Sequence, residues 1–119
     1  MNLFKKLQER AAAGNPIRIG MIGAGKFGTM FLAQALRIPA IHIMGVVDLI
    51  PANAKSNMKL AGWSDEAHSA VSLNDAAISG KTYVGDDWQA MITHPAVDIV
   101  IEATGNPLAA VTHCLAAFA

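Results

Sequence analysis

Three glycines follow a short apolar run near the start of the chain, and an acidic residue follows the next apolar run. The glycines have the spacing G-x-G-x-x-G and are Gly23, Gly25 and Gly28. A stretch rich enough in apolar side chains for a helix comes next, and Asp48 directly follows the second apolar run. A strand, a glycine turn, a helix and an acid about 20 residues further on are the pattern of a dinucleotide-binding site.

Each residue type has its own physical role in such a site. Gly23 allows a tight turn, and Gly25 has no Cβ that would hold a pyrophosphate away from the backbone. Gly28 allows close packing of helix on strand, and the helix N-terminus favours an anion. Asp48 is expected to accept hydrogen bonds from the adenosine ribose hydroxyls. The expected phosphate loop consists of Gly23, Ala24, Gly25, Lys26, Phe27 and Gly28.

Two other interpretations of this segment are compatible with the residues alone. A glycine-rich turn beside a surface aspartate would need no ligand. An acid after the second strand can also hold the ribose of S-adenosylmethionine, which would make the protein a methyltransferase. Gly25, followed by Gly28 at the start of the helix, favours a pyrophosphate, which S-adenosylmethionine lacks.

Composition limits the class of protein further. The 119 residues are enough for one domain with a real core. Nine basic and nine acidic residues give a formal net charge of zero, so nucleic acid and anionic membranes are not expected partners. The single cysteine, Cys114, cannot form an internal disulfide, which together with the lack of an apolar leader or spanning segment favours a cytoplasmic protein.

The histidines do not suggest a metal site. They are scattered along the chain, without carboxylates or cysteines at ligand spacing, and are His42, His68, His94 and His113. We expect surface or capping roles for them and no bound metal.

Strands and helices are predicted to alternate. Residues 1–16 are expected to form an amphipathic helix and a linker, and residues 17–119 a partial dinucleotide-binding domain. Within this domain we expect strands from Ile17 to the glycine turn and over 41–47, 82–84 and 96–103, and helices over 29–38, 51–60, 86–93 and from Pro107 onward. Short helices and loops are expected over 63–80. This alternation predicts an α/β fold of the Rossmann type, with a parallel sheet in the order 3-2-1-4.

A complete dinucleotide fold has two similar halves, whereas these elements make up the first half and the start of the second. We therefore expect the sequence to be the N-terminal part of a longer enzyme. The fourth strand would then have an uncovered edge, which favours pairing with another chain and hence a homo-oligomer.

A family resemblance rests on the glycine loop, Val47-Asp48, the segments 86–88 and 94–95, and the run from Val97 to Pro107. With these residues the chain resembles the nicotinamide-nucleotide domain of homoserine dehydrogenase-like oxidoreductases. It is most similar to the subgroup with a later SAF-type domain, which includes deoxyxylulose-phosphate reductoisomerase-like enzymes. The resemblance covers residues 17–119 and is carried most specifically by residues 102–107.

The resemblance implies a domain that binds NAD or NADP in an enzyme that transfers a hydride to or from a small polar substrate. By position, Thr104, Gly105 and Asn106 match the turn that faces the nicotinamide. The substrate-binding and catalytic residues would lie in a later domain, so this part alone would be inactive. A non-catalytic nucleotide-sensing regulatory module is the alternative from another functional class.

Two points stay open at this stage. The Asp48 carboxylate favours NAD by repelling a 2′-phosphate, whereas Lys55 or Lys59 could neutralise that phosphate. Because the resemblance points to NADPH, NADP is the expected cofactor and NAD the alternative. Glu102, at the end of the fourth strand, is either a structural acid bonded to nearby backbone or a group on the cofactor side.

Overall fold

A four-stranded parallel sheet forms the centre of the computed structural model, which describes residues 3–104, 113 and 115. The strands are β1 (Ile17–Ile22), β2 (Ile41–Val47), β3 (Tyr83–Gly85) and β4 (Ile99–Glu102). They lie in the order β3-β2-β1-β4, and every neighbouring pair is parallel. The predicted α/β class and the strand order 3-2-1-4 are confirmed, and the fold is Rossmann-like.

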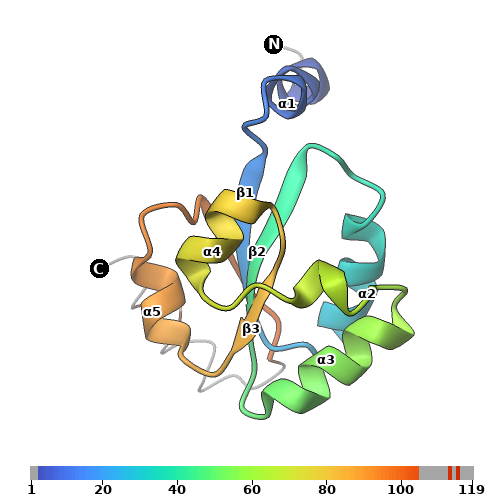
Figure 1. Ribbon diagram of the computed structural model, residues 1–119, viewed down its shortest axis with the longest axis vertical. Coiled ribbons are helices and arrows are strands. Elements are labelled where there is room, and N and C mark those ends of the chain that lie inside the picture. Colours follow the sequence, from blue (N-terminus) through green and yellow to red (C-terminus); the bar gives the residue numbers. More distant parts are fainter. Residues whose placement is uncertain (1–2, 105–112, 114, 116–119) are drawn as a thin grey trace.

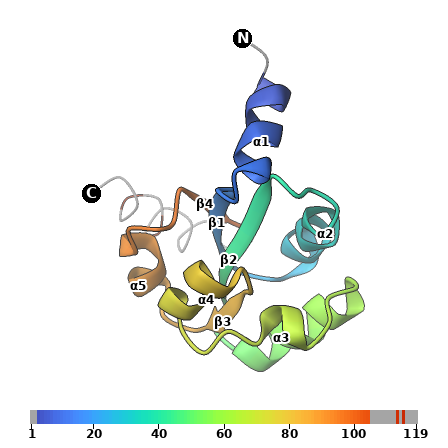
Figure 2. The ribbon, with the colours of Figure 1, turned by 45° about the horizontal axis from the view of Figure 1, so that its top comes forward.

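Helices cover both faces of this sheet (Figures 1 and 2). The helical elements are α1 (Leu3–Ala12), α2 (Lys26–Ala35), α3 (Pro51–Leu60), the short 3-10 helix η1 (Glu66–His68), α4 (Leu73–Ser79) and α5 (Trp88–Thr93). Helices α2 and α3 lie on one face, and α4 and α5 on the other, while α1 projects away from the sheet. Coverage on both faces explains why β1 and β2 consist mostly of apolar residues without alternation.

A methionine from α5 fills a hollow between the two central strands. A Cβ added to Gly20 in β1 would lie 3.0 Å from the Met91 sulfur, and one added to Gly45 in β2 would lie equally close. Met91 is fully buried there. Because neither glycine carries a side chain, α5 packs close against the carboxyl-terminal half of the sheet.

Some element boundaries differ from the prediction. Helix α2 begins at Lys26 and not at residue 29, because Gly25 is its N-cap and the end of the glycine motif already forms the first turn. Helix α5 begins at Trp88 because the Asp87 carboxylate caps it, accepting the N–H of Ala90 at 3.0 Å. Strand β3 lies one residue later than expected.

Strand β4 is shorter than the predicted 96–103. A turn precedes it, closed by the Val97 N–H that donates to the His94 carbonyl at 3.2 Å. Asp98 then exchanges two hydrogen bonds with the backbone of Arg18, one through its own N–H and one through its carboxylate. The regular strand therefore begins only at Ile99.

The helix expected from Pro107, and with it Gly105 and Asn106, lies outside the described residues. At the other end of the chain, α1 confirms a helix where an amphipathic one was expected, and Arg10 connects it to the sheet through an ion pair of 3.6 Å with Asp98. No helix in the described ranges is long and apolar enough to cross a membrane.

Candidate functional site

A cavity of about 340 Å³ lies at the carboxyl ends of the strands. Its lining comes from the ends of β1 and β2 and from the segments that follow β3 and β4, namely Ile22, Gly23, Gly25, Val47, Asp48, Leu49, Asp86, Trp88, Thr104 and His113. The cavity lies outside the carboxyl ends of neighbouring parallel strands, which is where open α/β sheets bind ligands. A larger cavity of about 550 Å³, near Arg18 and His42, contains none of the glycine-loop residues, so we place the candidate site at the carboxyl edge.

The three glycines of the loop have three different environments. Gly23 has a φ of +90°, and a Cβ on it would lie 2.9 Å from the backbone of Ala103. A Cβ on Gly28 would lie 2.7 Å from the Gly23 carbonyl oxygen. A Cβ on Gly25 would meet nothing within 4 Å, and the φ of Gly25, −76°, is one that any residue adopts. Gly23 and Gly28 are therefore required by the fold, whereas Gly25 leaves space open beside the cavity.

Side chains fix the loop residue Ala24 from both sides. Its N–H donates to Oδ2 of Asp48 at 3.0 Å. Its carbonyl oxygen accepts hydrogen bonds from Nδ2 of Asn57 at 2.8 Å and from the Thr29 hydroxyl at 3.1 Å. The loop is therefore held in one conformation by residues of the protein itself. The glycine motif gave no indication of Thr29 or Asn57, because their role depends on where α2 and α3 pack.

Asp48 lies at the cavity, as the sequence predicts, but it also has a structural role. Its second oxygen, Oδ1, accepts the N–H of Ile50 at 3.1 Å. Because a carboxylate oxygen can accept two hydrogen bonds, each oxygen still has capacity for a hydroxyl group of a ligand.

The side chains of Lys26 and Phe27 are exposed at the start of α2. The first backbone N–H groups of α2 lack partners within the helix and can bind an anion.

Buried His113, which lines the cavity, is paired with half-buried Glu102. Glu102, the last residue of β4, accepts the Thr104 N–H on Oε1 at 2.7 Å and is hydrogen-bonded through Oε2 to Nδ1 of His113. The His113 ring lies 4.5 Å from the Trp88 ring, measured between centroids. Glu102 is thus bonded to nearby backbone, as one interpretation expected, and it also orients a histidine that lines the cavity.

The expectation of surface or capping roles is wrong for two histidines. His68 and His113 are buried, with 7% and 8% of their surface exposed. His94 does cap a turn, since its Nδ1 accepts the N–H of Ala96 at 3.1 Å. The ring of His42 is hydrogen-bonded to the Lys81 carbonyl. The sequence alone does not show whether a histidine outside any motif is buried, because burial depends on how the helices and strands pack. In the part of the chain that is described, no three potential ligands cluster as a metal site would require.

The Glu102 interactions have a consequence for stability. Partial burial raises the pKa of Glu102, but the hydrogen bonds from Thr104 and His113 and the charge of His113 outweigh it, so the pKa lies below its ordinary value of 4.5. A lowered pKa in the folded state means that the carboxylate stabilises the fold above pH 4.5 and that this contribution is lost as the pH falls through the folded-state pKa.

We therefore expect Glu102→Gln to be less stable than the wild type at pH 6 and to approach it in stability at pH 3. Urea unfolding of both proteins across this range measures the difference. A difference in unfolding free energy that stays constant from pH 6 to pH 3 would contradict the role assigned to the Glu102 charge.

Compared with known proteins, the chain matches no protein-family model and no curated sequence. The residues around the cavity themselves fit a dinucleotide. The lining includes an unobstructed glycine at a helix N-terminus, an acid with spare acceptor capacity and a tryptophan.

Proposed function

We propose that this protein binds a nicotinamide dinucleotide, NAD or NADP, at the carboxyl edge of the sheet and serves as the cofactor domain of an oxidoreductase. One observation carries the proposal. A side chain at Gly23 or Gly28 would collide with backbone atoms, so the fold itself requires these two glycines. The fold does not require Gly25, and that glycine borders open space at the cavity. A glycine that borders open space at a cavity lets a ligand approach the backbone closely, which is the role of the second glycine in a dinucleotide loop.

In this proposal the N–H groups at the start of α2, within the loop from Gly23 to Gly28, hold the pyrophosphate. Asp48 accepts hydrogen bonds from the adenosine ribose beyond β2. Thr104 and the Trp88 ring would hold the nicotinamide, and Gly105 and Asn106 are assigned to the same role by the family resemblance alone. When bound, the nicotinamide would supply hydride transfer. The residues of this chain would bind and orient it.

The oxidoreductase part of the proposal rests on the resemblance carried by residues 102–107, of which 102–104 lie among the described ones. A small polar substrate, a homo-oligomeric assembly and a cytoplasmic location belong to the same proposal. Self-association is supported by β4, which is an edge strand of the sheet in the described ranges and has Ile99 exposed to 46%.

Isothermal titration calorimetry with NAD, NADH, NADP, NADPH and S-adenosylmethionine tests the proposal. We expect binding of a dinucleotide and no binding of S-adenosylmethionine, because the loop is built for a pyrophosphate. An oxidoreductase domain has to accept both redox forms, since each turnover converts one into the other. Binding of S-adenosylmethionine in place of a dinucleotide would support a methyltransferase. Strong discrimination between oxidised and reduced forms would support a sensor.

A further inference from the structure

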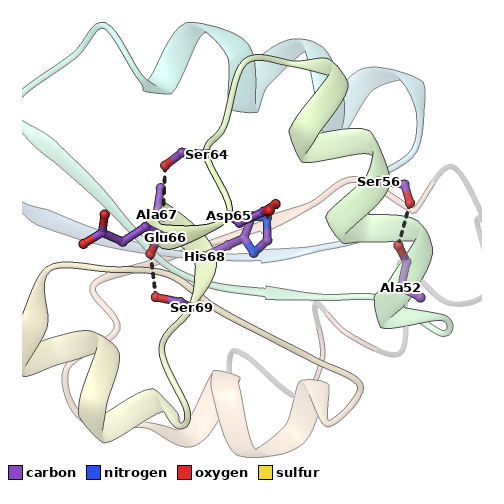
Figure 3. A network of polar contacts seen from close by, with 8 residues as sticks. All are labelled: Ala52, Ser56, Ser64, Asp65, Glu66, Ala67, His68 and Ser69. Carbon is purple, nitrogen blue, oxygen red and sulfur yellow. Dashed lines mark hydrogen bonds and ion pairs between the residues drawn. The ribbon is translucent and has the colours of Figure 1, made fainter.

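A third cavity, lined by polar side chains, lies between α3 and η1, apart from the proposed nucleotide site. It has a volume of about 560 Å³ and is lined by Lys55, Ser56, Lys59, Asp65, His68 and Ser69. None of these residues lines the cavity at the carboxyl edge of the sheet. Figure 3 shows the polar side chains at η1, together with Ser56 and Ala52 of α3. A ligand of this cavity would therefore not compete with the dinucleotide for the same residues.

His68 provides a buried polar atom without a partner in this cavity. The side chain is 7% exposed, and its Nε2 has no hydrogen-bond partner among the described residues. The Asp65 carboxylate is 3.8 Å from Nε2, too far for a hydrogen bond. In Figure 3 the His68 ring extends from η1 toward α3, with the Asp65 side chain beside it. An unsatisfied buried group costs about 1–3 kcal/mol, so an anion that replaces the Asp65 carboxylate beside Nε2 and hydrogen-bonds to it would recover that cost.

The other available donors of the cavity are cationic. Lys55 and Lys59 lie one turn apart on the same side of α3, both are exposed, and neither forms an ion pair within the described part of the chain. The hydroxyl of Ser56 already donates to the Ala52 carbonyl at 3.0 Å, and that of Ser69 to the Glu66 carbonyl at 2.6 Å. Two ammonium groups and the His68 Nε2 atom, which donates in the tautomer protonated there, therefore remain to bind a ligand.

We propose that this cavity binds a phosphate group, either as inorganic phosphate or as the phosphate of a small ester. A phosphate offers several charged acceptor oxygens, which match two ammonium groups and an imidazole N–H. Asp65 is the opposing charge. Its side chain is 83% exposed, so it turns into solvent when an anion occupies the space beside His68.

Titration of the protein with inorganic phosphate, followed by the His68 ring signals in NMR and by calorimetry, tests the assignment. We expect a saturable shift of the His68 signals. Lys59→Ala should weaken binding by about tenfold, the size of one charge-assisted hydrogen bond. Asp65→Asn should strengthen binding severalfold, because it removes the opposing charge. Lys6→Ala, which removes an exposed lysine of α1 outside this cavity, should leave binding unchanged. Both lysines of the cavity are exposed, so their variants keep the fold.

Three outcomes would overturn the proposal. An absence of saturable shifts at His68 would mean that water alone fills the cavity. Equal weakening by Lys6→Ala and Lys59→Ala would indicate general attraction of anions and no defined site. Loss of phosphate binding in Asp65→Asn would mean that Asp65 is a ligand-binding group and that the charge argument is wrong. None of these outcomes bears on NAD binding, which the calorimetry above measures separately.

Discussion

Replacement of Gly25 by valine is expected to weaken dinucleotide binding at least about a hundredfold and to leave the fold intact. A valine side chain would occupy the open space beside the helix N-terminus and prevent contact of the pyrophosphate with the backbone N–H groups. Charge-assisted hydrogen bonds are worth about 1.5–3 kcal/mol each, so loss of two of them accounts for this factor. Calorimetry measures the affinity, and circular dichroism with urea unfolding measures the fold.

Gly28→Ala is the matched control for this variant. A Cβ at Gly28 would lie 2.7 Å from the Gly23 carbonyl, so we expect it to destabilise the protein by about 1–3 kcal/mol, as overpacking does. The two substitutions should thus have different effects. Gly25→Val should lower the affinity for the dinucleotide, and Gly28→Ala should lower the stability of the fold. Unchanged affinity in Gly25→Val would show that the dinucleotide site is elsewhere. A large loss of stability in the same variant would show that the loop glycine serves the fold.

Preference for NAD over NADP is expected to be at least tenfold, and this preference should disappear in Asp48→Asn. At a separation of about 4 Å and an effective dielectric of 20, a carboxylate and a 2′-phosphate charge repel by about 4 kcal/mol, and solvent screening at this half-buried site reduces that value. Asp86 lines the same cavity and adds a second carboxylate. Titration of the wild type and of Asp48→Asn with NAD and with NADP gives the preference.

The lysines that would reverse this preference line a different cavity, together with His68. Our expectation of NAD rests on the Asp48 and Asp86 carboxylates, whereas the family resemblance implies NADP. Lys55→Ala and Lys59→Ala serve as controls, because neither should change the ratio of the two affinities. Tighter binding of NADP by the wild type, lost in either lysine variant, would refute the assignment and support the resemblance.

The sequence predicted the architecture well because its signals are local. Near-continuous apolar strands separated by helical stretches were enough for the parallel sheet and its order, and the glycine spacing located the loop. The exact ends of the helices and strands were predicted less well. Strand β4 begins late because Asp98 pairs with the backbone of Arg18, a contact between residues far apart in the sequence.

The candidate site was predicted in part for the same reason. Gly25 and Asp48 belong to a spaced motif, so the sequence located both at one cavity. Asn57 and His113 belong to no motif. Their contacts with Ala24 and Glu102 arise only when helices pack on the finished sheet, and no pattern in a single sequence encodes that packing.

Met91 can alter the shape of the cavity at the carboxyl edge of the sheet although it does not line that cavity. Its flexible side chain sets how deeply α5 lies over the two central glycines, Gly20 and Gly45, and Trp88 stands one helical turn earlier on the same helix, at the wall of the cavity. A change of side-chain volume at position 91 would therefore move Trp88, which forms part of the cavity wall. Natural or engineered substitutions of this buried residue would therefore widen or narrow the entrance of the cavity for different nucleotides and leave the phosphate loop unchanged.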